Sequence, residues 1–356
     1  MCYNSAMIKS ILFILILISL CPFAKADKTD DYVLKEMKKR HLPGISIAVI
    51  RNGKILKVKG YGVQDEKTGK PADSRTLYEI GSVGKTFVAT GILMLVERGR
   101  LNLTDPISRY IAETPKTWKS ITIRHLLSHT SGIKDYVTEI PRPEEKQEWS
   151  SADVYHRAAS TPLNFKPGEK YGYSHTNYVV LGMILGNRGG KSFDKFLEEE
   201  LFKPLEMTDT KPKEQVSESP NLAMGYRLVE DKTQEAVREE GKFADQYLVS
   251  SVSDLAKWAV ALDNGTVLTA ENRELMWTPT PLVDGKSAIY GLGWNTESLN
   301  GHRVVGHSGS VGGFSANLTR FPDDKLSIIV LTNQRDTSSF QLVRGIASLY
   351  KPALAK

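Results

Sequence analysis

Two residues in the segment 78–99, YEIGSVGKTFVATGILMLVERG, have the types and spacing needed for covalent chemistry. Ser82 and Lys85 stand three positions apart, and residues at i and i+3 share one face of a helix. The ammonium can then lie within hydrogen-bond reach of the hydroxyl and take part in proton transfer while the serine attacks a carbonyl carbon. The spacing therefore indicates acyl transfer through a serine nucleophile.

The same segment also ends like a phosphate-binding loop, with Gly84-Lys85-Thr86. Such a loop needs a further glycine five positions before Gly84, where the backbone turns tightly around the phosphates. Glu79 occupies that position, and its carboxylate would repel a phosphate. The sequence therefore argues against nucleotide binding at this segment.

The residues around Ser82 and Lys85 predict a buried helix. Its apolar positions lie nearly all round the helix axis and are Val83, Phe87, Val88, Ile92, Leu93, Leu95 and Val96. Burial lowers the pKa of a lysine towards a range that is useful for proton transfer. A serine in the first turn also lies close to backbone N–H groups that can stabilise an oxyanion.

The elements that must position this helix come from both ends of the chain. Residues 44–63 form two β-rich runs joined at Asn52-Gly53, the strongest short hairpin signal. Strand-like runs return as HRVVGHSGS, GGFSANLTRFP and LSIIVLTN, whereas residues 79–285 are mostly helical in pattern. We therefore expect an α/β (α+β) domain over 27–356. Its antiparallel sheet comes from about 40–78 and 286–335, is flanked by helices, and has a helical insertion over about 79–285.

Several further segments occur in a specific order along the chain. They are PGISIAVIRNGKI, GSVGKTFVATGILMLVERGRLNLTDPI, IRHLLSHTSGI, KPGEKYGYSHTNYVVLG, SSVSDLAKW and GHSGSVGGFS. Together they resemble the serine hydrolases related to class C β-lactamases, D,D-carboxypeptidases, D-aminopeptidases and family VIII esterases, over roughly residues 31–335. The resemblance implies a β-lactamase/transpeptidase-like fold with an antiparallel five-stranded sheet.

The resemblance also implies catalytic roles. Ser82 would be the acylated nucleophile and Lys85 its proton partner. Tyr173, in Tyr173-Ser174-His175, falls where this family places the tyrosine of its Tyr-x-Asn motif. Such a tyrosine can serve first as general base and then as general acid.

The third motif of the family is matched by His307-Ser308-Gly309, on the strand that borders the site. By the resemblance, the backbone N–H of Ser310 would join that of Ser82 in an oxyanion hole. Gly309 would let the backbone of the substrate approach this strand.

Two positions depart from the family pattern. His175 replaces the asparagine whose amide holds the acylamide carbonyl of a substrate, and His307 replaces a lysine that binds a substrate carboxylate. Because an ordinary imidazole titrates near about 6.5, we expect His307 to change charge across neutral pH. Both departures argue against an efficient β-lactamase, and an esterase or a peptidase with another specificity fits them better. The expected function is a secreted serine hydrolase of the esterase or D-amino-acid peptidase/carboxypeptidase type, with weak or no β-lactamase activity. The alternative is a penicillin-recognising sensor or binding module that acylates without efficient turnover.

A metal site is the other chemistry that the sequence suggests. His125 and His129 have the spacing of a zinc-binding helix, but Leu126 stands where the catalytic glutamate belongs. No third ligand is evident, so neither a metal nor an organic cofactor is expected.

The first 26 residues resemble a secretion signal. Lys9 precedes the apolar run of residues 11–20, and Ala24-Lys25-Ala26 provides a cleavage site before Asp27. We therefore expect a signal peptide over 1–26 and a periplasmic or secreted protein. Retention of the leader as an anchor, or a lipid on Cys21, is the alternative.

The composition limits the partners of the protein. Both cysteines, Cys2 and Cys21, lie in the leader, so the remaining chain is expected to contain no disulfide. The formal net charge is +6, and no basic cluster of the kind that binds nucleic acid is present. The expected partner is a small-molecule or peptide substrate, with no nucleic acid, and with a membrane only through an uncleaved leader.

Overall fold

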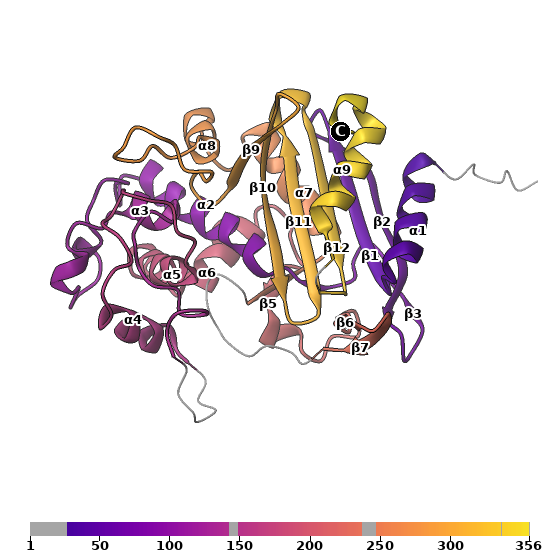
Figure 1. The fold of residues 1–356 in the computed structure, drawn as a ribbon, viewed down its shortest axis with the longest axis horizontal. Coiled ribbons are helices and arrows are strands. Elements are labelled where there is room, and N and C mark those ends of the chain that lie inside the picture. The colour runs from indigo at the N-terminus through magenta and orange to yellow at the C-terminus, as the bar shows by residue number, and fades with distance from the viewer. Residues whose placement is uncertain (1–26, 142–148, 237–246, 336, 356) are drawn as a thin grey trace, which may run out of the picture.

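A seven-stranded antiparallel sheet with helices on both faces forms one half of the molecule, and a mostly helical region lies beside it (Figure 1). The computed structural model describes residues 27–141, 149–236, 247–335 and 337–355. The predicted signal peptide, residues 1–26, lies outside these ranges. The sheet has the order β3-β2-β1-β12-β11-β10-β9. Its strands are β1 (Gly44–Arg51), β2 (Lys54–Asp65), β3 (Lys70–Pro71), β9 (Asn295–Leu299), β10 (His302–Val311), β11 (Phe314–Phe321) and β12 (Leu326–Thr332).

The fold class agrees with the prediction, but the number of strands was wrong. The sequence predicted five strands, and the structure adds β3 and β9, one at each edge. With two residues, β3 is too short to show an alternating pattern. The sequence of β9, NTESL, is mostly polar because an edge strand need not be buried on both faces.

The predicted hairpin at Asn52-Gly53 is present between β1 and β2. Asn52 has φ +52° and Gly53 has φ +68°, the left-handed pair of a type I′ turn, whose twist matches that of the strands. β1 then pairs on its other side with β12, so that Ile45 lies opposite Thr332. The first and last strands of the sheet are therefore direct neighbours at its centre.

The sheet separates two apolar cores. On one face lie α1 (Lys28–Arg40) and α9 (Ser339–Tyr350), which pack on alternate residues of β1 and β12 such as Ile47 and Val330. The other face carries the larger core, which includes α2 (Gly84–Glu97), α5 (His175–Gly189) and α7 (Val252–Asn264). Because the two central strands are covered on both faces, their sequences are almost continuously apolar.

The region between the two ends of the sheet is mostly helical, as predicted, and also contains short strands. Its other helices are α3 (Ile123–Leu127), α4 (Ser151–Ala159), α6 (Phe193–Leu197), the π-helix η4 (Glu198–Phe202) and α8 (Ala270–Trp277). Its strands are β4 (Tyr78–Glu79), β5 (Lys211–Pro212) and β8 (Leu248–Ser250), which form a small sheet, and the hairpin β6 (Tyr226–Val229) and β7 (Lys232–Glu235). Over the described ranges, every helix is too short or too polar to span a bilayer.

A buried ion pair joins the sheet to α7. Arg320 on β11 is only 2% exposed and pairs with Asp263. It also donates to the carbonyl oxygen of Ala259 at 3.1 Å and lies over the ring of Trp277, with 4.9 Å to the ring centroid. Burial lowers the pKa of Arg320, while Asp263 opposes that shift. Removal of Asp263 would leave a buried cation without its counter-charge.

We expect Asp263→Ala to lower the free energy of unfolding by about 3 kcal/mol, because a buried charge that loses its partner is costly. Urea unfolding followed by circular dichroism measures this change. Asp284→Ala is the control, since the Asp284–Lys286 pair is exposed to solvent and should contribute little to stability. Equal effects of the two substitutions would contradict a structural role for the buried pair.

Candidate active site

Ser82, Lys85 and Tyr173 meet at the start of α2. Ser82 lies in the short 3₁₀ turn η1 (Gly81–Val83) that leads into this helix. Lys85 Nζ donates to Ser82 Oγ at 2.9 Å, and the Tyr173 hydroxyl donates to the same oxygen at 3.0 Å. Lys85 is fully buried, as the apolar surroundings predicted. The structure therefore brings together the three residues to which the sequence assigned catalysis.

The backbone of β10 lies directly against η1. A Cβ atom on Gly309 would stand 2.0 Å from the carbonyl oxygen of Ile80, so only glycine permits this approach. Gly81 has φ +48°, and a Cβ there would lie 3.2 Å from the backbone nitrogen of Ser310. The backbone nitrogens of Ser82 and Ser310 thus belong to two segments in close contact, as the predicted oxyanion hole requires.

The side chains of β10 alternate in exposure at this edge. His307 and Gly309 are buried, whereas Ser308 and Ser310 are exposed. Ser308 and Ser310 therefore contribute exposed hydroxyls on the opposite face of the strand from the buried imidazole. As members of the third motif, Ser308 and Ser310 are assigned by the resemblance to substrate binding and the oxyanion hole, and this assignment remains a prediction.

His307 is a buried, neutral histidine, which corrects the expectation that it titrates near pH 6.5. Only 4% of it is exposed, and its Nδ1 lies 2.7 Å from the carbonyl oxygen of Ser308. A carbonyl can only accept, so Nδ1 carries the proton and Nε2 accepts from the Tyr290 hydroxyl at 2.8 Å. Burial, and then the nearby charge of Lys85, lower the pKa of His307 to about 3.

This low pKa of His307 predicts a pH dependence of stability. Between pH 7 and 5 the unfolded chain takes up a proton on this histidine and the folded chain does not, so stability falls as the pH falls. For a folded pKa of about 3, the loss over this range is about 2 kcal/mol. In His307→Gln, the decrease in the free energy of unfolding from pH 7 to 5 should be smaller by that amount.

Urea unfolding at the two pH values measures the difference. His156→Gln is the control, because His156 is exposed on α4 and should leave the dependence on pH unchanged. An equal pH dependence in the parent and His307→Gln proteins would show that the imidazole can be protonated in the folded state.

His175 is held by a carboxylate that the sequence reasoning missed. Its Nδ1 lies 3.1 Å from Oδ2 of Asp135 and 3.2 Å from Oδ1, and its backbone N–H donates to Oδ1 at 3.2 Å. Burial alone would raise the pKa of Asp135, but its bonds with His175 hold the pKa below the ordinary value. The ring of His175 lies 5.1 Å from that of Tyr173, nearly perpendicular to it. The imidazole therefore has a fixed position beside the predicted catalytic tyrosine.

His129 packs under Tyr173, at a ring-centroid distance of 4.2 Å. Its Nδ1 lies 3.2 Å from the backbone nitrogen of Ser174, which donates to it, and 3.1 Å from Nδ2 of Asn177. Burial, and then the charge of Lys85, lower the pKa of His129 well below its usual value. His129 is therefore a neutral residue that positions the turn carrying Tyr173.

The metal-like spacing of His125 and His129 has a structural explanation. His125 Nδ1 accepts from the backbone N–H of Thr122 in the capping box of α3. Among the described residues, no three histidine, cysteine or carboxylate side chains are grouped as metal ligands. The LLSHTSG segment, which contains His129, resembles a structural turn of the family, but its contact with Tyr173 could not be predicted from the sequence. The sequence around Tyr290 and Asp135 does not predict a role for either residue. Their roles depend on contacts with His307 and His175 that form only in the folded chain.

The fold and the site together define a class of protein, the β-lactamase/transpeptidase-like serine hydrolases. The fold is an antiparallel sheet flanked by helices. The site has Ser-x-x-Lys at the start of a buried helix and a tyrosine whose hydroxyl bonds to the serine oxygen. The family model described as Beta-lactamase matches residues 29–349. The chain belongs to this beta-lactamase family, which agrees with the resemblance inferred from its motifs.

Individual relatives support the same assignment. Protein flp of Staphylococcus aureus (strain NCTC 8325 / PS 47) is 32% identical over 316 residues, which cover 85% of this chain and 62% of that protein. The chain thus spans less than two thirds of the length of flp. Penicillin-binding protein 4* of Bacillus subtilis (strain 168) is 27% identical over 338 residues, or 86% of this chain and 74% of that protein.

A solved structure shows the same fold. The octameric penicillin-binding protein homologue from Pyrococcus abyssi superimposes with a TM-score of 0.79 at 29% identity, over 92% of this chain and 77% of that one. The penicillin-binding protein from Bacillus halodurans, at 22% identity and a TM-score of 0.76, shares the fold. The predicted fold class is therefore confirmed.

Proposed function

We propose that the protein hydrolyses an ester or an amide through an acyl-enzyme formed on Ser82. The observation that carries this proposal is the pair of contacts at Ser82 Oγ, 2.9 Å from Lys85 Nζ and 3.0 Å from the Tyr173 hydroxyl. A serine oxygen with two proton-transfer partners at hydrogen-bond distance has the geometry of an activated nucleophile. Membership of a family of serine hydrolases supports the same reaction.

The proposed reaction has two steps. Ser82 Oγ attacks the carbonyl carbon, and its proton passes to the Lys85–Tyr173 pair and then to the leaving alcohol or amine as its bond to carbon breaks. Water then adds to the acyl-enzyme and releases the acid, and a proton returns to Ser82. In both steps the backbone N–H groups of Ser82 and Ser310 would stabilise the oxyanion.

The second and third motifs favour uncharged substrates. His307 is neutral, and both of its ring nitrogens are already hydrogen-bonded, so it supplies no fixed positive charge for a substrate carboxylate. His175 has Nδ1 occupied by Asp135, and its ring cannot reproduce the paired donor and acceptor of an amide. We therefore infer an esterase or a D-amino-acid peptidase with weak or no β-lactamase activity.

A substrate panel tests this function. Purified protein is assayed with p-nitrophenyl esters, D-amino-acid amides, D-Ala-D-Ala peptides and nitrocefin, with Ser82→Ala as the blank. Steady turnover of an ester or a D-amino-acid amide, well above that of nitrocefin, is expected. A single stoichiometric burst with every substrate would instead identify a sensor that acylates without turnover. Nitrocefin as the best substrate would overturn the argument from His175 and His307.

We also propose that residues 1–26 are removed on export, so that the periplasmic or secreted protein begins at Asp27. The apolar run followed by Ala24-Lys25-Ala26 supports this proposal. The intact mass of the exported protein measures the cleavage point. A lipid-modified product that starts at Cys21 would contradict it.

A further inference from the structure

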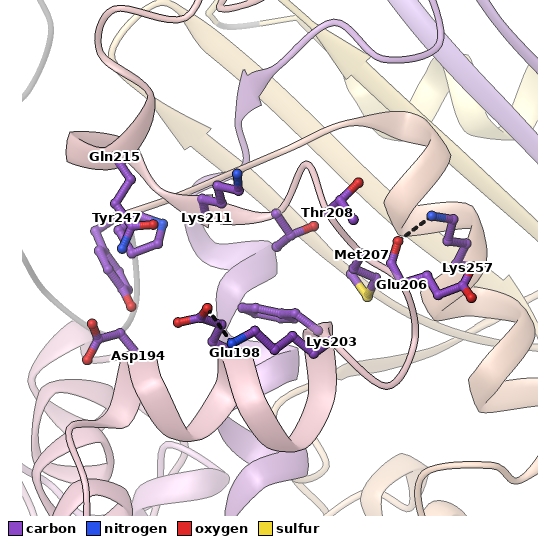
Figure 2. Close-up of a pocket in the computed structure, with 13 residues that line it drawn as sticks. Asp194, Glu198, Lys203, Glu206, Met207, Thr208, Lys211, Gln215, Tyr247 and Lys257 are labelled. Carbon is purple, nitrogen blue, oxygen red and sulfur yellow. Dashed lines mark hydrogen bonds and ion pairs between the residues drawn. The ribbon is translucent and has the colours of Figure 1, made fainter.

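A cavity lies apart from Ser82, between η4, the segment 203–212 and Tyr247 (Figure 2). Its volume is about 610 Å³, within the range of roughly 300–1,000 Å³ typical of small-molecule sites. None of the predicted catalytic or substrate-binding residues lines it. Its wall includes Phe202, whose ring centroid lies 5.2 Å from that of Phe87 on α2. Phe87 follows Lys85 by two residues, so the two side chains point to different sides of that helix.

The inner wall of the cavity is apolar. Phe202 and Met207 are almost fully buried, and Pro212 is partly buried beside them. These side chains offer no hydrogen-bonding groups, so they favour the apolar part of a ligand.

One end of the cavity carries a buried hydroxyl. Tyr247 is only 4% exposed, and its hydroxyl oxygen has no hydrogen-bond partner among the described residues. Figure 2 shows the hydroxyl at the same end of the cavity as the Asp194 carboxylate. Burial, and then the charges of Asp194 and Glu214, raise the pKa of Tyr247. A ligand group that bonds to this hydroxyl would remove the cost of burying it without a partner.

The charges on the cavity wall are unevenly paired. Lys203 bonds to Glu198 at 3.0 Å, and Lys257 lies 3.4 Å from Asp254. Neither Lys211 nor Asp194 forms an ion pair with any other residue that the structure describes. Glu206, which also lines the cavity, likewise forms no ion pair with a described residue, so the cavity presents one ammonium and two carboxylates whose charges are not locally matched.

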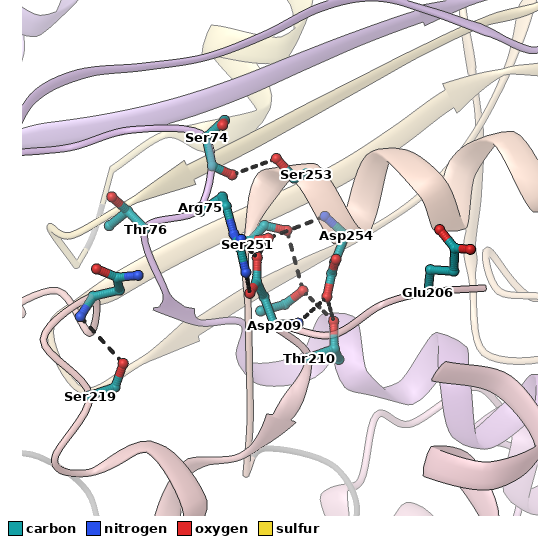
Figure 3. Close-up of polar contacts among 12 residues, drawn as sticks. Ser74, Arg75, Thr76, Glu206, Asp209, Thr210, Ser219, Ser251, Ser253 and Asp254 are labelled. Carbon is teal, nitrogen blue, oxygen red and sulfur yellow. Dashed lines mark hydrogen bonds and ion pairs between the residues drawn. The ribbon is translucent and has the colours of Figure 1, made fainter. Parts of the chain in front are cut away.

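A network of hydrogen bonds fixes the segment that forms one side of the cavity (Figure 3). Asp254 on α7 accepts from the backbone N–H of Asp209 at 2.7 Å and from the Thr210 hydroxyl at 3.0 Å. Arg75 donates to both carboxylate oxygens of Asp209, at 2.6 and 3.2 Å. Because these bonds hold the segment from both sides, the cavity is formed before any ligand binds.

We propose that this cavity binds a zwitterionic molecule of dipeptide size with an apolar side chain. The ammonium of the ligand would lie between the Asp194 carboxylate and the Tyr247 hydroxyl oxygen, and its carboxylate would pair with Lys211. The apolar side chain would lie against Phe202 and Met207. The site is separate from Ser82, so the proposal does not depend on the proposed hydrolysis.

Isothermal titration of the Ser82→Ala protein with L-alanyl-L-phenylalanine tests the proposal, since this variant cannot consume the peptide through Ser82. The dipeptide should bind once per chain. The N-acetyl derivative, which lacks the ammonium, and the C-terminal amide, which lacks the carboxylate, should each bind about tenfold or more weakly. Equal affinity of all three compounds would overturn the proposed recognition of both charges.

Substitutions in the same Ser82→Ala background locate the binding site. Tyr247→Phe and Lys211→Met should each weaken binding of the dipeptide about tenfold, and Asp194→Asn provides an independent variant if Tyr247→Phe fails to fold. Lys119→Met is the matched control, because Lys119 is exposed and does not line the cavity. No binding of the dipeptide, or binding unchanged by Lys211→Met and by Tyr247→Phe or Asp194→Asn, would overturn the proposal.

Discussion

Ser82→Ala is expected to reduce the rate of hydrolysis by a factor of roughly 10³ or more. The substitution removes the nucleophile, and the proton transfer by Lys85 and Tyr173 serves no purpose without it. The substituted chain should remain folded, since the serine side chain is small and only partly buried. Steady-state rates on the best substrate of the panel measure the loss. A fluorophosphonate probe should label the parent protein once and the variant not at all.

Ser308→Ala is the matched control for this experiment. Ser308 is an exposed serine on β10, directly after His307, and its side chain lies on the other face of the strand from that imidazole. Its replacement should leave labelling intact. Labelling that maps to Ser308, or persists in Ser82→Ala, would refute the assignment of the nucleophile.

Tyr173→Phe is expected to lower the rate by about 10²–10⁴, the usual contribution of a positioned acid or base. The substitution removes only the hydroxyl that lies 3.0 Å from Ser82 Oγ and keeps the ring that packs on His129. The fold should therefore be preserved, with the loss mainly in kcat. Measurement of kcat and KM for one ester, together with a thermal unfolding curve, separates these effects.

Tyr171→Phe serves as the control because Tyr171 is two residues away and also packs on His129 and Tyr290. Among the described residues, Ser82 bonds to Lys85 and Tyr173 and not to Tyr171. It should retain a rate within a few-fold of the parent. A Tyr173→Phe protein with a near-parental rate would exclude the tyrosine from proton transfer and leave Lys85 as the sole base.

Much of the catalytic centre could be predicted because its signals are local. Ser82 and Lys85 are three residues apart on one helix, and their position relative to each other follows from helix geometry. The hairpin at Asn52-Gly53 is similarly determined by two residues with positive φ. Tyr173 was found only through the order of the family motifs, since nothing in its own segment points to Ser82.

The environment of the site could not be predicted, because it depends on segments that are distant in sequence. His307 was correctly placed on a strand, but its burial and its contact with Tyr290 decide that it is neutral. The carboxylate of Asp135 lies forty residues before His175, and no sequence spacing links the two. A residue type gives the ordinary pKa of a side chain, whereas the surroundings that shift this pKa exist only in the folded protein.

The pairing of β1 with β12 has a consequence for the synthesis of the protein. The ribosome makes β1 long before β12, its partner at the centre of the sheet. Until Thr332 has emerged, β1 offers an apolar edge with unsatisfied backbone groups, and such an edge favours association with other chains. The nascent chain therefore cannot pair β1 on this side until β12 has been made, and a chaperone that covers the strand would protect it until then. A chain that stopped before Leu326 would keep every predicted catalytic residue but would lack the central strand that completes the sheet.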